Sequence, residues 1–343
     1  GKCDMVGMGR GILAEREWVK KCAEGREDEL RYCISCMNCF NVNPFSYEQT
    51  NCSVNPFALR EGSKRPIVQD GDGRLVAVIG AGPAGMEAAV TLKQRGFDVV
   101  VFDKRDEIGG NLHVAKKPPF KGKFEWAIDY YKSMAKKLNI TMKLGKEVTA
   151  QEVLALKPYS ILVATGSNVI SIPLEGLDQV QTVQAHDVLA NDMQFANKKV
   201  VVIGGGITGL ETALYINRQG TNQVSVVDML PEWPVDMLDM RYQNEALLEV
   251  RHCNDQGVAL FYNNKVVKFA DGKLFIESTK DGEVKELPAD VIVLSVGVKP
   301  NDALWQELLA SGHPSVWKAG DAIATGKINK AVLHGSKFGY SLN

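Results

Sequence analysis

The chain has 343 residues, of which 45% are hydrophobic and 24% charged, and its formal net charge is −1. This composition is ordinary for a folded globular protein of two or three domains. Lysine and arginine form no basic stripe and no apolar run reaches membrane-spanning length, so nucleic-acid and membrane partners are not expected. Seven cysteines without a signal-peptide pattern indicate a reducing, cytoplasmic setting rather than a secreted disulfide scaffold.

The first 25 residues predict one strand–turn–helix unit. Residues 3–8 are expected to form a buried strand that runs into Gly9 and Arg10, and an amphipathic helix is expected at about residues 15–25. One such unit cannot bury its own faces, so we expect a fragment that lacks earlier βα units. In a barrel, Gly9 and Arg10 would lie on a loop that binds cofactor phosphates. A surface turn with a solvated arginine is the alternative.

Four cysteines follow within a 20-residue window, at Cys33, Cys36, Cys39 and Cys52. Thiolates are soft ligands that select zinc or iron–sulfur clusters, and four of them complete either site. Zinc sites usually pair two CxxC knuckles, whereas three of these cysteines recur at every third position. The spacing therefore favours a [4Fe–4S] cluster, with zinc as the alternative.

A dinucleotide-binding fingerprint follows the cysteine window. An apolar strand is predicted at 75–79, then the glycine turn GAGPAG at 80–85, then a helix at 83–95. The glycines let the backbone approach a pyrophosphate, which lies on the helix N-terminus. The next strand, 98–102, ends at Asp103, a carboxylate suited to a ribose hydroxyl. The strand, helix and acid together make a strong signal, which a lone GxGxxG is not.

The same unit recurs about 120 residues later. A strand at 198–203 leads into GGGITG at 204–209 and a helix at 206–219, and the next strand ends at Asp228. Because no arginine directly follows Asp228, we expect NADH rather than NADPH. Strands at 161–167 and 291–297 close the two nucleotide units. Asp321, before a predicted helix at 328–340, is placed to hold the ribityl chain of a flavin.

Together these residues resemble the iron–sulfur flavoenzymes related to old yellow enzyme, a family that includes 2,4-dienoyl-CoA reductase, enoate reductases and trimethylamine dehydrogenase. The spacing of the cysteines is more like the amine-dehydrogenase branch and many anaerobic ene reductases. The matching segments are DMVGMGR (4–10), the cysteine window, CSVNP (52–56), GAGPAG, GGN (109–111), VATGS (163–167), GGGITG and GDA (320–322).

The resemblance implies an α/β protein with two nested Rossmann-like domains behind a cluster segment and the last βα unit of a TIM barrel. The implied domains are the barrel end at 1–25, the [4Fe–4S] segment at 26–62, an FAD-binding domain at 63–187 plus 302–343, and an NAD-binding domain at 188–301. The missing barrel would hold FMN and the substrate. No cysteine pair stands near Gly109 and Gly110, where disulfide reductases of this architecture carry a redox-active disulfide.

The resemblance also implies a role for particular residues. Gly9 and Arg10 match the FMN-phosphate turn, and the four window cysteines match the cluster ligands. The FAD site is implied at Gly80, Gly82, Pro83, Ala84, Gly85, Asp103, Lys104, Gly110, Asn111, Val148, Ala164, Thr165, Gly166, Gly320, Asp321 and Val332. The NAD site is implied at Gly204, Gly206, Ile207, Gly209, Asp228 and Gly297. Glu211 matches a residue that often lies near the nicotinamide and is the candidate catalytic residue, with a solvated helix carboxylate as the alternative.

The function implied is electron transfer from NADH to FAD, to the cluster and to FMN, for reduction of an activated C=C bond of an enoate or enoyl-type substrate. The fragment alone would show NADH-to-acceptor (diaphorase) activity. Its partners would be its own N-terminal barrel half, a small-molecule substrate and a second copy of the chain. Three alternatives stay open: an amine dehydrogenase with ADP in the FAD site, a reductase that passes electrons to a ferredoxin-like carrier, and a nucleotide-binding scaffold with structural zinc.

Overall fold

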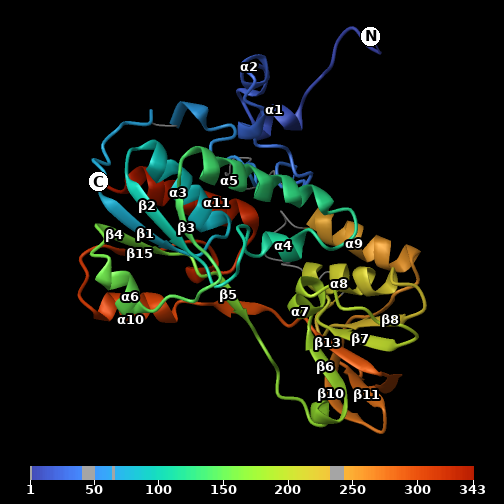
Figure 1. Cartoon of the computed structure of the whole chain (residues 1–343). Coiled ribbons are helices and arrows are strands. Elements are labelled where there is room, and N and C mark those ends of the chain that lie inside the picture. The colour runs from blue at the N-terminus through green and yellow to red at the C-terminus, as the bar shows by residue number, and fades with distance from the viewer. Residues whose placement is uncertain (1, 41–50, 64–65, 232–242) are drawn as a thin grey trace.

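The computed structural model describes residues 2–40, 51–63, 66–231 and 243–343. Two parallel five-stranded sheets, each covered by helices, lie side by side (Figure 1). A two-stranded antiparallel sheet connects them. In the described part of the chain, no helix is both long enough and apolar enough to cross a bilayer.

The first sheet has the strand order β15-β4-β1-β2-β3, with every neighbouring pair parallel. Its strands are β1 (Leu75–Ile79), β2 (Asp98–Phe102), β3 (Thr141–Lys143), β4 (Ser160–Val163) and β15 (Val316–Lys318). One face is covered by α3 (Pro83–Gln94), α5 (Glu125–Lys137) and α11 (Ile328–Ser341), and the other by α6 (Ala150–Ala155) and α10 (Ala303–Ala310). Burial on both faces explains the continuous apolar runs of β1 and β4.

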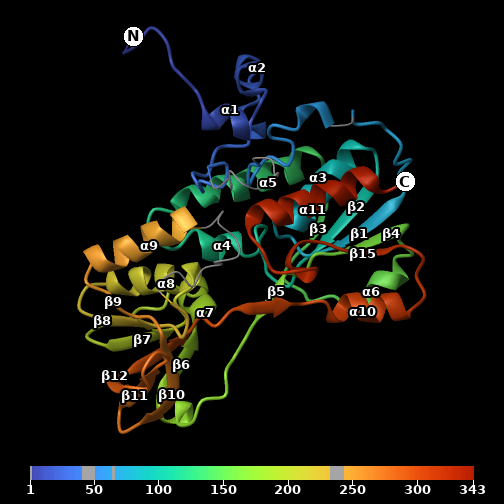
Figure 2. The same ribbon diagram turned by 180° about the vertical axis from the view of Figure 1, so that it is seen from behind.

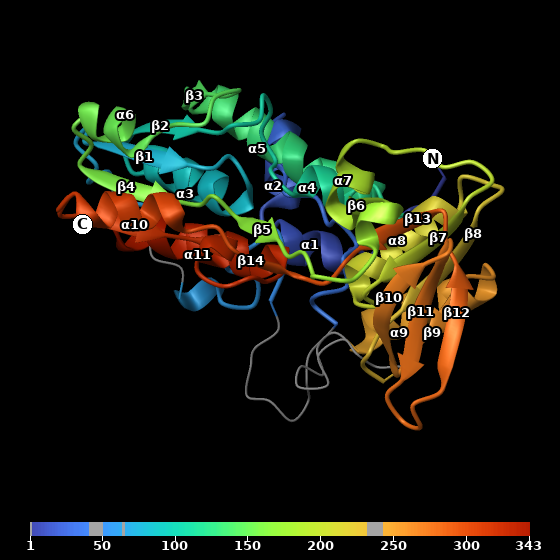
Figure 3. The ribbon, with the colours of Figure 1, turned by 90° about the horizontal axis from the view of Figure 1, so that it is seen from below.

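The second sheet repeats this plan with the order β6-β13-β7-β8-β9. Its strands are β6 (Gln181–Gln184), β7 (Lys199–Ile203), β8 (Gln223–Val227), β9 (Ala259–Phe261) and β13 (Val291–Leu294). Helices α7 (Ala185–Ala190), α8 (Ile207–Asn217) and α9 (Gln243–Asp255) cover one face. An antiparallel sheet of β10 (Asn264–Ala270), β11 (Lys273–Ser278) and β12 (Val284–Pro288) packs on the other (Figure 3). The predicted α/β class with parallel sheets is confirmed.

The two halves are connected by the antiparallel pair β5 (Ser167–Val169) and β14 (Val298–Pro300). The chain leaves the first sheet after β4 and has already entered the second sheet at β6, which pairs with β13. β6 therefore finds its hydrogen-bonding partner in the second sheet, and the predicted domain boundaries remain predictions.

The N-terminal segments contact α5 and the short helix α4 (Leu112–Ala115) through Ala14, Ile34 and Val54, while the beginning of the chain extends away from them (Figure 2). The predicted strand at 3–8 is wrong: this segment is coil, and Met5 and Val6 are 88% and 74% exposed. No strand in the described residues pairs with it, so an extended conformation gains no hydrogen bonds. The predicted helix at 15–25 is shorter, and two helices form, α1 (Arg10–Ala14) and α2 (Trp18–Ala23).

Candidate functional site

The two glycine turns have the same backbone geometry. Gly80 and Gly204 have φ of +113° and +108°, which only glycine adopts without strain. A Cβ atom on either would overlap a carbonyl oxygen at the end of the neighbouring strand, that of Ala164 or that of Ser295. Gly85 and Gly209 pack directly on the carbonyl oxygens of Gly80 and Gly204. The first and third glycines of each turn are thus required by the close contact of strand, turn and helix.

The middle glycines face open space instead. Gly82 and Gly206 are the extended N-cap residues of α3 and α8, and neither helix has a side-chain cap. A Cβ atom on Gly206 would meet nothing within 4 Å, and one on Gly82 would meet only the Cα of Gly110 at 3.9 Å. The free N–H groups of each first helical turn therefore border a space without side chains, which fits the pyrophosphate of a dinucleotide.

The two strand-end acids hold the glycine turns themselves. Asp103 Oδ2 accepts from the Ala81 N–H at 2.7 Å, and Asp228 Oδ2 accepts from the Gly205 N–H at 2.6 Å. The Oδ1 atoms accept from backbone N–H groups two residues ahead, those of Arg105 and Leu230, both at 2.8 Å. Sequence reasoning missed this structural role, and the predicted ribose contact remains a prediction.

We expect Asp228→Ala to weaken NADH binding and Asp103→Ala to lower FAD content, each without affecting the other nucleotide. Each variant removes one charge-assisted hydrogen bond to the glycine turn and one to the backbone two residues after the acid. A loss of about 1.5–3 kcal/mol corresponds to roughly 10- to 150-fold in affinity. Titration calorimetry with NADH and the flavin absorbance of purified protein measure the two effects. Equal losses of both nucleotides in both variants would show that the turns are not separate sites.

Segments far apart in sequence meet the N-terminus of α3. The Gly109 N–H donates to Ala81 O at 2.9 Å, and a Cβ atom on Gly320 would contact Ala84 Cβ at 3.0 Å. Asp321 follows directly, and its carboxylate accepts from Ser167 Oγ at 3.3 Å and from the Gly326 N–H at 3.0 Å. Burial raises the pKa of Asp321.

The other predicted nucleotide contacts lie around this point with different exposure. Pro83 opens α3, as Ile207 opens α8. Val148 and Val332 are buried, whereas Lys104 is exposed. Gly166 and Gly297 are in left-handed conformations next to β5 and β14, and Thr165 Oγ1 donates to Asn301 O. Asn111 is the N-cap residue of α4 but makes no capping hydrogen bond with its side chain, and its Oδ1 accepts from Arg105 Nη2 at 3.4 Å. Their contacts with a nucleotide remain predictions.

Glu211 lies at the contact between the two nucleotide domains. Its carboxylate is paired with Lys121, from the segment after α4, and Lys121 also lies 3.3 Å from Glu245 on α9. Glu245 in turn pairs with Lys327, the N-cap residue of α11. The solvated reading of Glu211 is wrong, since the residue is 7% exposed. The sequence analysis missed Lys121, and the run KKPPFK before Gly122 was the signal that could have found it.

Burial governs the ionisation of these groups. It raises the pKa of Glu211 to about 7, although Lys121 opposes the shift. For Lys121, burial is outweighed by the negative charges of Glu211 and Glu245, and its pKa lies above the ordinary value. For Glu245, Lys327 and Lys121 likewise outweigh burial and lower the pKa.

The four window cysteines lie near one another, half-buried. Cys36 Sγ is 3.2 Å from Ser53 Oγ, and Cys33, Cys36 and Cys52 border the apolar cluster of α4 and α5. Burial, and then the neighbouring thiols, raise the pKa of Cys39. In the described residues, no three cysteine, histidine or acidic side chains are close enough together to hold a metal ion.

The backbone of the window is unusual in two places. Ser35, between Cys33 and Cys36, and Met37, just after Cys36, have φ of 55° and 57°. Left-handed conformations at non-glycine residues are uncommon and cost about 1–2 kcal/mol each. Four thiols on one loop are suited to bind a metal ion or an iron–sulfur cluster. Their side chains are not arranged as a metal site in the described residues. Gly9 is the N-cap residue of α1, and Arg10 Nη1 lies 3.2 Å from Met37 Sδ. The predicted contact of Gly9 and Arg10 with a cofactor phosphate remains a prediction.

Two parallel sheets, each with a glycine turn opening a helix beside a strand-end acid, are typical of a protein with two dinucleotide-binding sites. The chain belongs to the family described as pyridine nucleotide-disulphide oxidoreductase, whose model matches residues 74–333. That family binds FAD and NAD(H), so the chain is an NAD(P)H-linked flavin oxidoreductase.

Longer oxidoreductases match most or all of the chain. It is 34% identical over 351 residues to an NADH oxidase of Thermoanaerobacter brockii, covering 100% of this chain and 52% of the relative. It is 34% identical over 301 residues to a bilirubin reductase of Mediterraneibacter gnavus, covering 88% and 46%. A solved 2-naphthoyl-CoA reductase complex superposes with a TM-score of 0.85 at 28% identity, covering 98% of this chain and 50% of that one. The resemblance to the iron–sulfur flavoenzymes related to old yellow enzyme is confirmed, and the chain spans about half the length of the relatives it matches.

Proposed function

We propose that this chain is the NADH-oxidising half of an ene reductase, in which electrons pass from NADH to FAD, to a [4Fe–4S] cluster and to FMN. The observation that carries the proposal is the pair of matched glycine turns, each with an uncapped helix N-terminus and open space at its middle glycine. FAD at the first turn would supply an acceptor for the hydride of NADH that can release electrons one at a time.

In this proposal the residues of the chain bind and orient the two nucleotides. The N–H groups at Gly82 and Gly206 bind the two pyrophosphates, and Asp103 and Asp228 hold the turns in place. Asp321, beside the α3 N-terminus, is suited to the ribityl chain. NADH is favoured because Asp228 is followed by Met229, and Arg218 is engaged elsewhere, 3.2 Å from Gln256 Oε1. Arg241 lies outside the described residues.

Cys33, Cys36, Cys39 and Cys52 would hold the cluster. Support comes from the four half-buried thiols and the left-handed residues Ser35 and Met37 between them. The raised pKa values of Cys39 and Cys52, the latter about 11, show that unpaired thiolates are unfavourable here. A cationic iron cluster would reverse that preference, because thiolates bind it in the charged form.

The proposed partner is the FMN-binding barrel that the longer relatives have room for. Apolar side chains of the N-terminal segments lie open to solvent, as a surface that another domain covers would. The exposed residues are Met5, Val6, Val19, Met37, Phe40, Leu59 and Val68. The substrate, an activated C=C compound, would bind in that barrel.

The test is a visible spectrum of anaerobically purified protein before and after one equivalent of NADH. We expect flavin bands that bleach with NADH, over a broad cluster absorbance near 400 nm, with about four iron and four sulfide per chain. A chain that binds ADP and no flavin would favour the amine-dehydrogenase alternative. Zinc without sulfide would favour the nucleotide-binding scaffold.

A further inference from the structure

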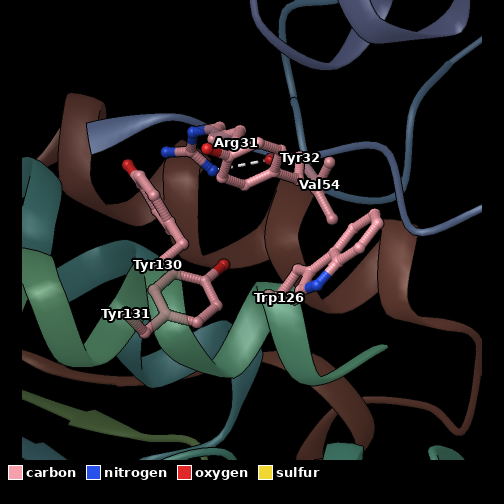
Figure 4. A pocket seen from close by; sticks show the side chains of 7 residues that line it. Arg31, Tyr32, Val54, Trp126, Tyr130 and Tyr131 are labelled. Carbon is pink, nitrogen blue, oxygen red and sulfur yellow. Dashed lines mark hydrogen bonds between the residues drawn. The ribbon is translucent and has the colours of Figure 1, made fainter. Parts of the chain in front are cut away.

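Arg31 lies where both ends of the cysteine window meet the first nucleotide domain (Figure 4). It stands two residues before Cys33, and its Nη1 donates at 2.6 Å to the carbonyl of Val54, two residues after Cys52. The same guanidinium donates to both carboxylate oxygens of Glu87 on α3, at 2.8 and 3.0 Å. The side chain of Arg31 therefore links the segment before the window to the segment after it and to α3.

The surroundings leave this guanidinium little freedom. The side chain of Glu87 is 3% exposed and also accepts from Tyr131 Oη at 3.1 Å. Burial raises the pKa of Tyr131, so the phenol keeps its proton and donates it. Arg31 stacks on the Tyr130 ring with its Cζ 4.3 Å from the ring centre. The adjoining hollow has room for about one water molecule.

A buried ion pair of this kind is a poor source of net stability, because the desolvation of both charges offsets their attraction. The pair instead fixes relative orientation, because the planar guanidinium makes two hydrogen bonds to one carboxylate in a single geometry. Glu87 is two residues beyond Gly85, so the bonds tie the window to the helix whose N-terminus borders the first dinucleotide space.

We propose that Arg31 is a positioning residue, which through Glu87 and Val54 fixes the cysteine window to α3 and so sets the placement of the thiols against the first dinucleotide site. The inference rests on the proposed function, which assigns a [4Fe–4S] cluster to the thiols and FAD to the first glycine turn. The bonds themselves require neither cofactor.

The test is the alkylation rate of the window thiols in the full, reduced, metal-free chain under native conditions, followed by mass spectrometry with iodoacetamide. In Arg31→Met/Glu87→Leu, which replaces the pair by apolar side chains, we expect the four window thiols to react about ten-fold faster. Cys253, which is fully buried on α9, should keep its rate and reports any general loosening. Arg31→Lys, which keeps the charge and loses the fork, should give an intermediate rate.

The chain offers a matched control at the other end of α3. Arg95 donates to both oxygens of Asp70, at 2.8 and 2.6 Å, and to the Gly339 carbonyl at 2.7 Å. Its partners are a carboxylate and a backbone carbonyl, as for Arg31, but they lie far from the window, and the Asp70 side chain is 44% exposed. Arg95→Met/Asp70→Leu should leave the window thiols at the wild-type rate. Unchanged rates in the Arg31 variants, or equal increases in the Arg95 control or at Cys253, would overturn the proposal.

If the double variant does not fold, Arg31→Lys decides alone, and a wild-type rate there overturns the proposal. Flavin content, measured on the same samples, tests the proposed function separately. A wild-type chain that binds no flavin would contradict that function and leave the thiol rates as informative as before.

Discussion

Gly85→Ala should abolish FAD binding, whereas Gly209→Ala should leave FAD bound and abolish its reduction by NADH. In each variant the new methyl group would overlap the carbonyl oxygen of the first glycine of the turn, which is Gly80 or Gly204. Backbone cannot yield as a flexible side chain can, so the helix start must move away and withdraw its N–H groups from the pyrophosphate. We expect a loss of more than about 100-fold in affinity, or roughly 3 kcal/mol.

Flavin absorbance per chain and the rate of bleaching by NADH measure the two results. Gly122→Ala is the matched control, because a Cβ atom there meets nothing within 4 Å and no left-handed conformation is required. Full flavin occupancy in Gly85→Ala would refute the assignment of the first turn to FAD. Loss of flavin in Gly209→Ala would show that the two domains do not bind their nucleotides independently.

The nucleotide domains could be predicted from sequence because local patterns determine them. The helix predicted at 83–95 is found at Pro83–Gln94, and the one predicted at 206–219 at Ile207–Asn217. In both, an apolar strand, a glycine turn and a helix follow within about 25 residues, so the signal lies within one unit. The segment 3–8 also contains apolar residues, but no strand in the described part of the chain pairs with it, and composition alone does not show whether a partner strand exists.

The candidate site was predictable where a motif marks it and not where packing makes it. The sequence marked Glu211 by its place after GGGITG, but its burial and its partner depend on how the two domains meet. Lys121 is 90 residues away in sequence, and Arg31 is joined to Glu87 across 56. Asp103 and Asp228 directly follow strands, as the sequence predicts, but their bonds to the turns depend on backbone positions that a motif does not specify.

The contact between the two domains leads to the second large effect: Lys121→Met should destabilise the protein by about 3–5 kcal/mol. The variant removes the cation shared by Glu211 and Glu245, whose side chains are 9% and 20% exposed, and leaves Glu211 buried without a counter-charge. Glu245 keeps Lys327, so the loss falls mainly on Glu211. Chemical denaturation measures the free energy of unfolding, and Lys146→Met, at a 70% exposed surface pair, is the control that should change little.

The pH dependence distinguishes this electrostatic cause from simple loss of packing. The folded-state pKa of Glu211, about 7, lies above its ordinary 4.5, so the folded protein binds the extra proton. The contribution of Glu211 to stability is therefore fully present below pH 4.5 and is lost as the pH rises through 7. Without Lys121 the pKa of Glu211 rises further, and the variant must lose more stability at pH 8 than at pH 5.5. A penalty independent of pH would mean that Lys121 acts through packing, and that attraction across the domain contact does not hold the two nucleotide sites together.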